Sequence, residues 1–224
     1  MPEAKPNHMI ACLYCGAESA DEHFCSECGR ILPLAAGGDY FSFLGLPRKL
    51  RLDEAELEKA FYALSRKLHP DYLMTASDAE RRASIQRSSM LNDAYRTLRN
   101  PVSRAAYLLA LEGYKEAEKK APPDLLEEVF ELNMQIEELK SAKKMGDEDE
   151  VNEARAALAE ALAHLNGRLA ELDNRLFALF EKWDAALDGG AGGGDRETVL
   201  NQMSELLSHR SYIRNLVRDI REEM

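Results

Sequence analysis

The chain has 224 residues, enough for one large domain or for two or three small ones. Hydrophobic residues make up 45% of it and charged residues 31%, a balance that supports a core and excludes a chain disordered as a whole. The net charge of −11 argues against general nucleic-acid binding, and no apolar run approaches the roughly 20 residues of a membrane-spanning helix. The N-terminus has neither the apolar core of a signal peptide nor the Arg-rich pattern of a transit peptide, so we expect a soluble, cytoplasmic protein.

Residues 1–38 contain all the cysteines, followed by a short linker. The cysteines form two Cys-x2-Cys pairs separated by nine residues: Cys12, Cys15, Cys25 and Cys28. Two such pairs can offer four thiolates to one metal ion, and a metal site is favoured over disulfides because nothing exports the chain. We expect structural zinc, since four thiolates leave no coordination position open, with iron as the alternative. His23 could act as a substitute ligand, but a polar loop residue is the simpler interpretation.

Residues 39–113 form a first helical block. Apolar residues recur in it at three- and four-residue steps along residues 53–68 and again before Pro101, which predicts two amphipathic helices. Asp53 is suited to cap the first of these helices. Shorter helices are expected at "DYFSFLG" and "VSRAAYLLALEG", and the two long helices should pack as an antiparallel hairpin.

The loop between the two long helices contains His69, Pro70 and Asp71. Pro70 fixes its own φ and disfavours helical geometry at His69, so the first helix must end at Leu68. The histidine and the aspartate are then held outside the helix as hydrogen-bonding groups. An ordinary helix end explains the tripeptide equally well, so these three residues alone do not assign a function.

The order of motifs around this loop resembles that of a J-domain. The resemblance covers residues 39–113 and depends on "DYFSFLGLP", "LSRKLHPD" and "LNDAYRTLRNPVSRAAYLL", in this order. It implies that the His-Pro-Asp loop stimulates ATP hydrolysis by a 70-kDa heat-shock chaperone, which also contacts a basic face of the preceding helix. The residues that would carry these roles are His69, Pro70 and Asp71 in the loop and Lys59, Arg66 and Lys67 on the helix. Tyr72 stands where many general J-domain proteins have a basic residue.

The break at "KKAPP" begins a second block within residues 114–224. Apolar residues at alternating four- and three-residue steps predict three helices, and the middle one needs about 40 residues, or roughly 60 Å. These narrow apolar stripes predict a three-helix antiparallel bundle, interrupted at "MGDEDE" and at the flexible "DGGAGGGD". The whole chain is therefore predicted to be all-α, with a four-cysteine zinc knuckle, a J-domain helical hairpin and a C-terminal three-helix bundle.

Four apolar residues of the second block lie one position away from these stripes: Leu126, Phe130, Tyr212 and Leu216. Each is rotated about 100° from the core-facing residues of its helix. Together they could form one exposed patch, which usually marks a partner site. A wider core stripe, normal for globular helices, explains them equally well from the pattern alone.

Residues 39–224 as a whole resemble the HscB-type co-chaperones of iron–sulfur cluster assembly. "LLEEVFELNMQIEEL" and "HRSYIRNLVRDIREE" are similar to the first and last helices of that family's C-terminal domain, and some relatives carry a four-cysteine extension. The resemblance implies a bundle that binds an IscU-type scaffold protein and presents it to the chaperone. It favours the exposed patch and aligns Leu126, Phe130 and Glu131 with scaffold-contacting positions. Glu127 falls where relatives often have an apolar residue.

Three functional hypotheses follow. The first is a co-chaperone adaptor that is not an enzyme, because the sequence offers no phosphate-binding loop and no nucleophile–base constellation. The second is a general J-domain protein whose bundle binds unfolded chains or another assembly factor. The third is a nucleic-acid or redox module around the cysteines. Nucleic-acid binding is disfavoured because that segment is acidic and lacks a basic stripe, and reversible metal release on mild oxidation would support the redox version. The pattern leaves open whether the metal-binding segment stabilises the N-terminus, supports dimerisation or binds a further partner.

Overall fold

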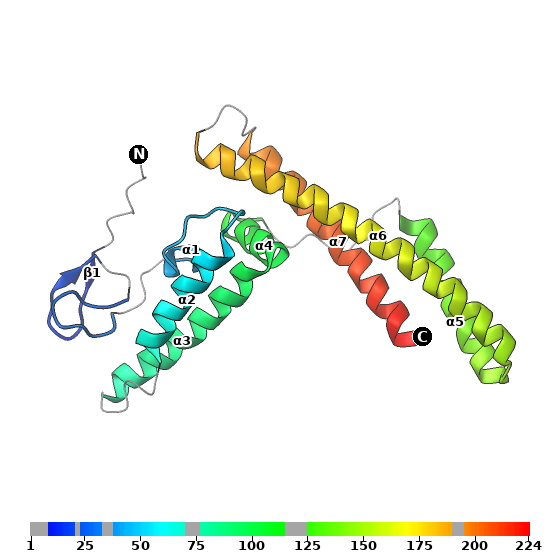
Figure 1. The fold of residues 1–224 in the computed structure, drawn as a ribbon, viewed down its shortest axis with the longest axis horizontal. Helices are drawn as coiled ribbons and strands as arrows, with labels where there is room; N and C mark the ends of the chain where they lie inside the picture. Colours follow the sequence, from blue (N-terminus) through cyan, green and yellow to red (C-terminus); the bar gives the residue numbers. More distant parts are fainter. Residues whose placement is uncertain (1–8, 21–22, 33–37, 70–76, 115–124, 190–194) are drawn as a thin grey trace. The chain divides into compact units, whose positions relative to one another are not determined.

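The computed structural model describes residues 9–20, 23–32, 38–69, 77–114, 125–189 and 195–224. Seven helices and two very short strands make up the described secondary structure, which confirms the all-α prediction (Figure 1). The chain divides into two compact units, residues 1–104 and 105–224, with the boundary inside helix α4 (Pro101–Leu111). The segment boundaries predicted after residues 38 and 113 stay predictions. Among the described helices, none has both the length and the hydropathy needed to cross a bilayer.

Unit 1 begins with the cysteine segment, by which we mean the described residues between 9 and 32. Strands β1 (Ile10–Ala11) and β2 (Glu18–Ser19) pair antiparallel, and a single bridge joins Phe24 to Ile31. A small core forms inside the segment, from Ile10, Cys12, Cys25 and Leu32. Two of the four cysteine side chains are therefore part of the segment's own hydrophobic core.

The helices of unit 1 are α1 (Tyr40–Phe43), α2 (Glu54–Leu68), α3 (Asp78–Arg99) and the first part of α4. The Asp53 side chain caps α2 by accepting hydrogen bonds from two backbone N–H groups of its first turn, as predicted. A full capping box starts α3, where Ser77 and Glu80 bond to each other's backbone. Helices α2 and α3 pack against each other through fully buried leucines, at Leu57, Leu68, Leu91 and Leu98.

Unit 2 is built from three helices, α5 (Leu126–Met145), α6 (Glu148–Leu187) and α7 (Arg196–Glu223). The 40 residues of α6 match the predicted length. Gly146 ends α5 in the left-handed region at φ 75°, where a side chain would be strained, and Asp147 caps α6 directly afterwards. Helix α6 packs along both α5 and α7, whereas α5 and α7 meet only over a short stretch (Figure 1). Both sides of α6 are consequently covered, and part of the surface of α5 is left to solvent.

Candidate functional site

The four cysteine sulfurs lie together, all within 4.8 Å of one another. The Sγ–Sγ distances are 3.6 Å between Cys12 and Cys28 and 3.6 Å between Cys15 and Cys25. Four sulfurs placed 2.3 Å from a tetrahedral metal ion would be about 3.8 Å apart, so this cluster has the size of a four-thiolate site. None of the four cysteines forms a disulfide. The predicted grouping of the cysteines is confirmed, and the residues can hold one metal ion.

The two Cys-x2-Cys pairs form matching backbone turns. The N–H of Cys12 donates to the Ala17 carbonyl, and the N–H of Cys25 donates to the Arg30 carbonyl, each at 2.8 Å. The glycine that follows each pair closes the turn onto the first cysteine at 2.9 Å and has φ near 70°, which favours glycine. This repetition explains why one thiol of each pair faces the inner side of the segment. Cys12 and Cys25 are buried, whereas Cys15 and Cys28 are exposed.

The thiols of the cluster differ in acidity. Backbone N–H groups of Cys15 and then Tyr14 bond to the Cys12 sulfur and lower its pKa to about 6. The Ala17 N–H lowers the pKa of Cys15, but desolvation and the three neighbouring thiols outweigh this effect and raise the pKa to about 12. The Arg30 N–H likewise lowers the pKa of Cys28, and desolvation with the neighbouring Cys12 outweighs it, so the net direction is upward. The Cys12 sulfur is therefore mainly a thiolate at neutral pH and can bind a metal ion without first losing a proton.

Adding Zn²⁺ to the metal-free protein at pH 7.5 should release protons, because Cys15 and Cys28 are then protonated and bind metal only as thiolates. We expect about two protons or more per ion. Below about pH 6 Cys12 also takes up a proton, so the affinity for Zn²⁺ should fall more steeply as the pH drops further. Calorimetry in buffers of different ionisation enthalpy measures the proton count. Protein with alkylated thiols is the control, and a heat independent of the buffer would contradict the expectation.

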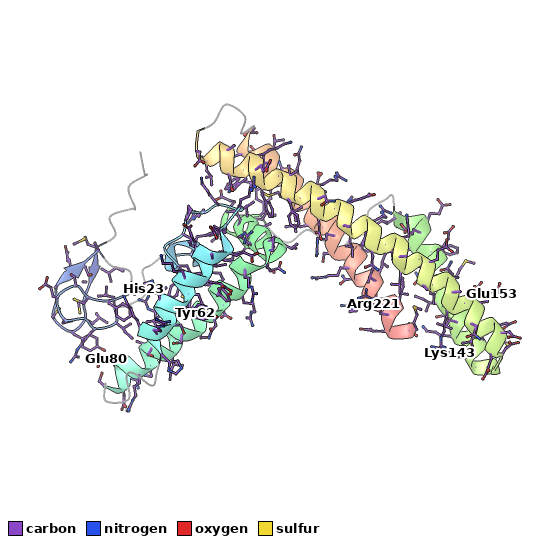
Figure 2. The ribbon with its side chains drawn as sticks, viewed as in Figure 1. His23, Tyr62, Glu80, Lys143, Glu153 and Arg221 are labelled. Carbon is purple, nitrogen blue, oxygen red and sulfur yellow. The ribbon has the colours of Figure 1, made fainter. Side chains whose placement is uncertain are left out.

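His23 lies in a bend, as predicted for a polar loop residue, but it is not among the clustered ligands, so only the substitute-ligand interpretation needs correction. Its Nε2 lies 2.8 Å from the Phe43 carbonyl oxygen, and its Nδ1 lies 3.1 Å from Nη1 of Arg87. A carbonyl only accepts and a guanidinium only donates, so Nε2 carries the proton and Nδ1 accepts. Both ring nitrogens are thus engaged with the helices of unit 1 (Figure 2). Sequence reasoning missed this role because the two partners are 20 and 64 positions away.

Of the predicted His-Pro-Asp site, the structure describes His69, which directly follows α2. Helix α2 ends at Leu68, as predicted, and His69 follows with φ −64° and ψ 129°, the extended geometry that precedes a proline. The His69 side chain is exposed. Pro70, Asp71 and Tyr72 lie outside the described residues. The structure therefore shows how the chain leaves the helix, and the role of the tripeptide stays a prediction.

The predicted basic face of α2 is exposed. Lys59 and Arg66 are seven positions apart and share one face of the helix with Tyr62, which is also exposed (Figure 2). Lys67 lies one position further around, and its Nζ is 5.8 Å from the centre of the Phe24 ring of the cysteine segment. The exposed face of α2 consequently combines the cationic side chains of Lys59 and Arg66 with the aromatic ring of Tyr62. The contact of this face with a chaperone stays a prediction.

The predicted patch of unit 2 is exposed on α5 but not on α7. Leu126 is 57% exposed and Phe130 is 66% exposed, and Glu131 beside them is also exposed. Met134, 50% exposed, continues the same row one turn further, which the sequence analysis had not singled out. Tyr212 and Leu216 on α7 are only half-buried. The exposed row on α5, consisting of Leu126, Phe130 and Met134, is named the α5 row below.

Acidic side chains border the α5 row. A groove of about 540 Å³ between α5 and α6 is lined by Glu127, Glu131 and Glu160 among others. Glu128, at the same groove, is occupied by an ion pair with Arg168 at 2.6 Å and by His164 at 3.1 Å. The exposed apolar row therefore lies next to negative charge, which suits a partner surface that carries cationic groups.

Comparison with known proteins reveals the family. The DnaJ domain model matches residues 39–107. The "Iron-sulfur cluster co-chaperone protein HscB" of Mus musculus is 32% identical over 180 residues, which cover 77% of this chain and 71% of the relative. The chain belongs to the HscB family of J-domain co-chaperones. The predicted resemblance is thereby confirmed.

Further members of the HscB family agree with this assignment. The "Co-chaperone protein HscB homolog" of Vibrio cholerae is 35% identical over 158 residues, covering 67% of this chain and 85% of the relative. The crystal structure of human co-chaperone protein HscB superposes with a TM-score of 0.70 at 26% identity, over 94% of this chain and 96% of that one. The likeness to the human structure extends beyond the J-domain to nearly the whole chain.

Proposed function

We propose that this protein is a co-chaperone of iron–sulfur cluster assembly that acts as an adaptor between two proteins. Its unit 2 binds an IscU-type scaffold protein, and its J-domain stimulates the ATPase of a 70-kDa heat-shock chaperone through His69, Pro70 and Asp71. The protein itself is not an enzyme; the hydrolysis takes place on the chaperone. The mouse relative, named an iron–sulfur cluster co-chaperone, supports the same pathway for this chain.

The observation that carries the proposal is the α5 row. Truly core-facing leucines of α5, such as Leu132 and Leu139, are buried against α6, whereas Leu126 and Phe130 are more than half exposed on the same helix. An exposed leucine and phenylalanine one turn apart contribute little to the packing of the bundle, and such residues typically bind a partner. Glu131 and the half-buried Tyr212 and Leu216 complete the proposed scaffold surface.

On the J-domain side, Lys59, Arg66 and Lys67 would contact acidic groups of the chaperone. All three are exposed on α2, and Arg66 and Lys67 lie in its last turn, next to the point at which the His-Pro-Asp loop begins. At the N-terminus, Cys12, Cys15, Cys25 and Cys28 would hold zinc in a structural role, because four thiolates complete a tetrahedral site. Nucleic acid and membranes have no part in the proposed function.

Two measurements on the wild-type protein test this proposal. Calorimetric titration of an IscU-type scaffold should show saturable binding, and the steady-state ATPase of the chaperone should rise further when scaffold and co-chaperone are added together. Stimulation without any scaffold binding, together with capture of unfolded chains, would contradict the scaffold assignment and favour a general J-domain protein. A control titration with an unrelated protein of cationic surface should give no binding heat, because negative charge beside the α5 row alone should not bind it.

A further inference from the structure

One face of α3 carries three polar residues that are largely hidden from solvent: Ser84, Arg87 and Ser88. Their i, i+3 and i+4 spacing places them on a common side of the helix. Ser84 is fully buried and Arg87 is 2% exposed, so each must find its hydrogen-bond partners inside the protein. Those partners come from two different parts of unit 1, the end of α2 and the cysteine segment.

The two serines hold the end of α2. Ser84 Oγ donates to the Leu68 carbonyl oxygen at 2.6 Å, and Ser88 Oγ donates to the same oxygen at 2.8 Å. A carbonyl in the last turn of a helix lacks an intrahelical donor, and the two hydroxyls replace it. Because Leu68 is the last residue of α2, these bonds fix the point at which the chain turns into His69 and the His-Pro-Asp loop.

Arg87, between the two serines, holds the cysteine segment. Its Nη2 donates to the Leu32 carbonyl oxygen at 2.7 Å, and its Nη1 donates to His23 Nδ1 at 3.1 Å. The His23 ring in turn packs edge-on against Phe43, with ring centres 4.7 Å apart, and donates to the Phe43 carbonyl. A buried guanidinium is costly without acceptors, so the cysteine segment and α3 stabilise each other's position.

A second contact joins the cysteine segment to the first turn of α3. Arg30 Nε lies 3.4 Å from Glu80 Oε1, and Glu80 also forms the capping box of α3 with Ser77. Glu80 and Arg87 are seven residues, or about two helical turns, apart. The cysteine segment thus contacts α3 at Glu80 and again at Arg87. Two contacts at different heights of the helix restrain both its rotation about its axis and its shift along that axis.

We propose that the cysteine segment is a positioning element of the J-domain. It holds α3 through Arg87 and Glu80, so that Ser84 and Ser88 keep the end of α2, and with it His69, in a fixed place. A metal ion bound by the four thiolates would keep the segment folded, so metal loss would displace the Leu32 and His23 acceptors of Arg87 and loosen the end of α2. The effect on chaperone stimulation depends on the proposed function, but the coupling inside the J-domain does not.

Amide hydrogen exchange on the full-length protein tests the coupling without any partner. Stripping Zn²⁺ from the zinc-loaded protein with a chelator should raise the exchange rate of residues 66–69 about tenfold, and added Zn²⁺ should restore it. Arg87→Lys should raise it while zinc is bound, because a lysine keeps the charge but cannot reach both acceptors. Loss of protection in the cysteine segment with unchanged exchange at residues 66–69 would overturn the proposal.

Chaperone stimulation tests the serines. The double variant Ser84→Ala/Ser88→Ala should lower the maximal stimulation of the ATPase about fivefold, because the loop is less well positioned, and should leave scaffold affinity unchanged. Ser89→Ala, at an exposed serine of the same helix, is the matched control and should behave as wild type. Equal maximal stimulation by the double variant and the control would overturn the role of the serines. Failure of the wild-type protein to stimulate would instead disprove the proposed function, and the exchange experiment would still decide the coupling.

Discussion

Replacing His69 with glutamine is expected to abolish stimulation of the chaperone's ATPase and to leave the fold intact. The His69 side chain is exposed just beyond the last turn of α2, so its replacement removes no packing from the core. We expect the free energy of unfolding to change by less than about 0.5 kcal/mol. Glutamine keeps the approximate size and polarity of histidine but removes the imidazole ring. The proposed function requires this ring for stimulation of the chaperone.

Single-turnover ATP hydrolysis by the chaperone, with and without the variant, measures the loss. Two controls show that the variant is folded: its thermal unfolding midpoint and its affinity for the scaffold should both match those of the wild type. Full stimulation by His69→Gln would disprove the mechanism assigned to the loop, whatever the result of scaffold binding.

Truncating the α5 row should weaken scaffold binding strongly. The double variant Leu126→Ala/Phe130→Ala removes two large apolar side chains that are mostly exposed, and the affinity for the scaffold should fall about 100-fold or more. Because the core of the bundle loses little, we expect the free energy of unfolding to drop by less than about 1 kcal/mol. Basal stimulation of the chaperone without scaffold should be unchanged, since the J-domain is untouched.

Met145→Ala is the matched control for this experiment. Met145 is 77% exposed on the last turn of the same helix, at the opposite end from Leu126, and its truncation should leave scaffold affinity as in the wild type. Calorimetry on both variants gives the comparison. Wild-type affinity in the double variant would show that the scaffold binds elsewhere, and an equal loss in both variants would indicate a general effect on α5.

Helix α7 provides a poorer test of the same surface. Tyr212 and Leu216 are half-buried, so their truncation removes core packing together with any partner contact. The α5 row separates the two effects because most of its surface is exposed. This difference between the helices could not be read from their sequences, in which both apolar pairs have the same offset.

Features that depend on neighbours along the chain could be predicted from the sequence. The end of α2 at Leu68 follows from the geometry that Pro70 imposes on the preceding residue. The grouping of the cysteines follows from two short turns, each closed by a glycine. The length of α6 follows from an apolar pattern that continues over the whole helix. The helix end and each of the two cysteine turns are controlled by interactions that span only a few residues.

Which apolar and polar side chains meet a partner depends on how the helices and the cysteine segment pack. Periodicity identifies the apolar side of a helix but not how far a neighbouring helix covers it, so Leu126 and Tyr212 looked equivalent in sequence. It also gives no sign that Arg87 meets His23 across 64 positions, or that Ser84 bonds to Leu68 across 16. Such contacts depend on how helices and the cysteine segment pack, because the partners become neighbours only when the chain is folded.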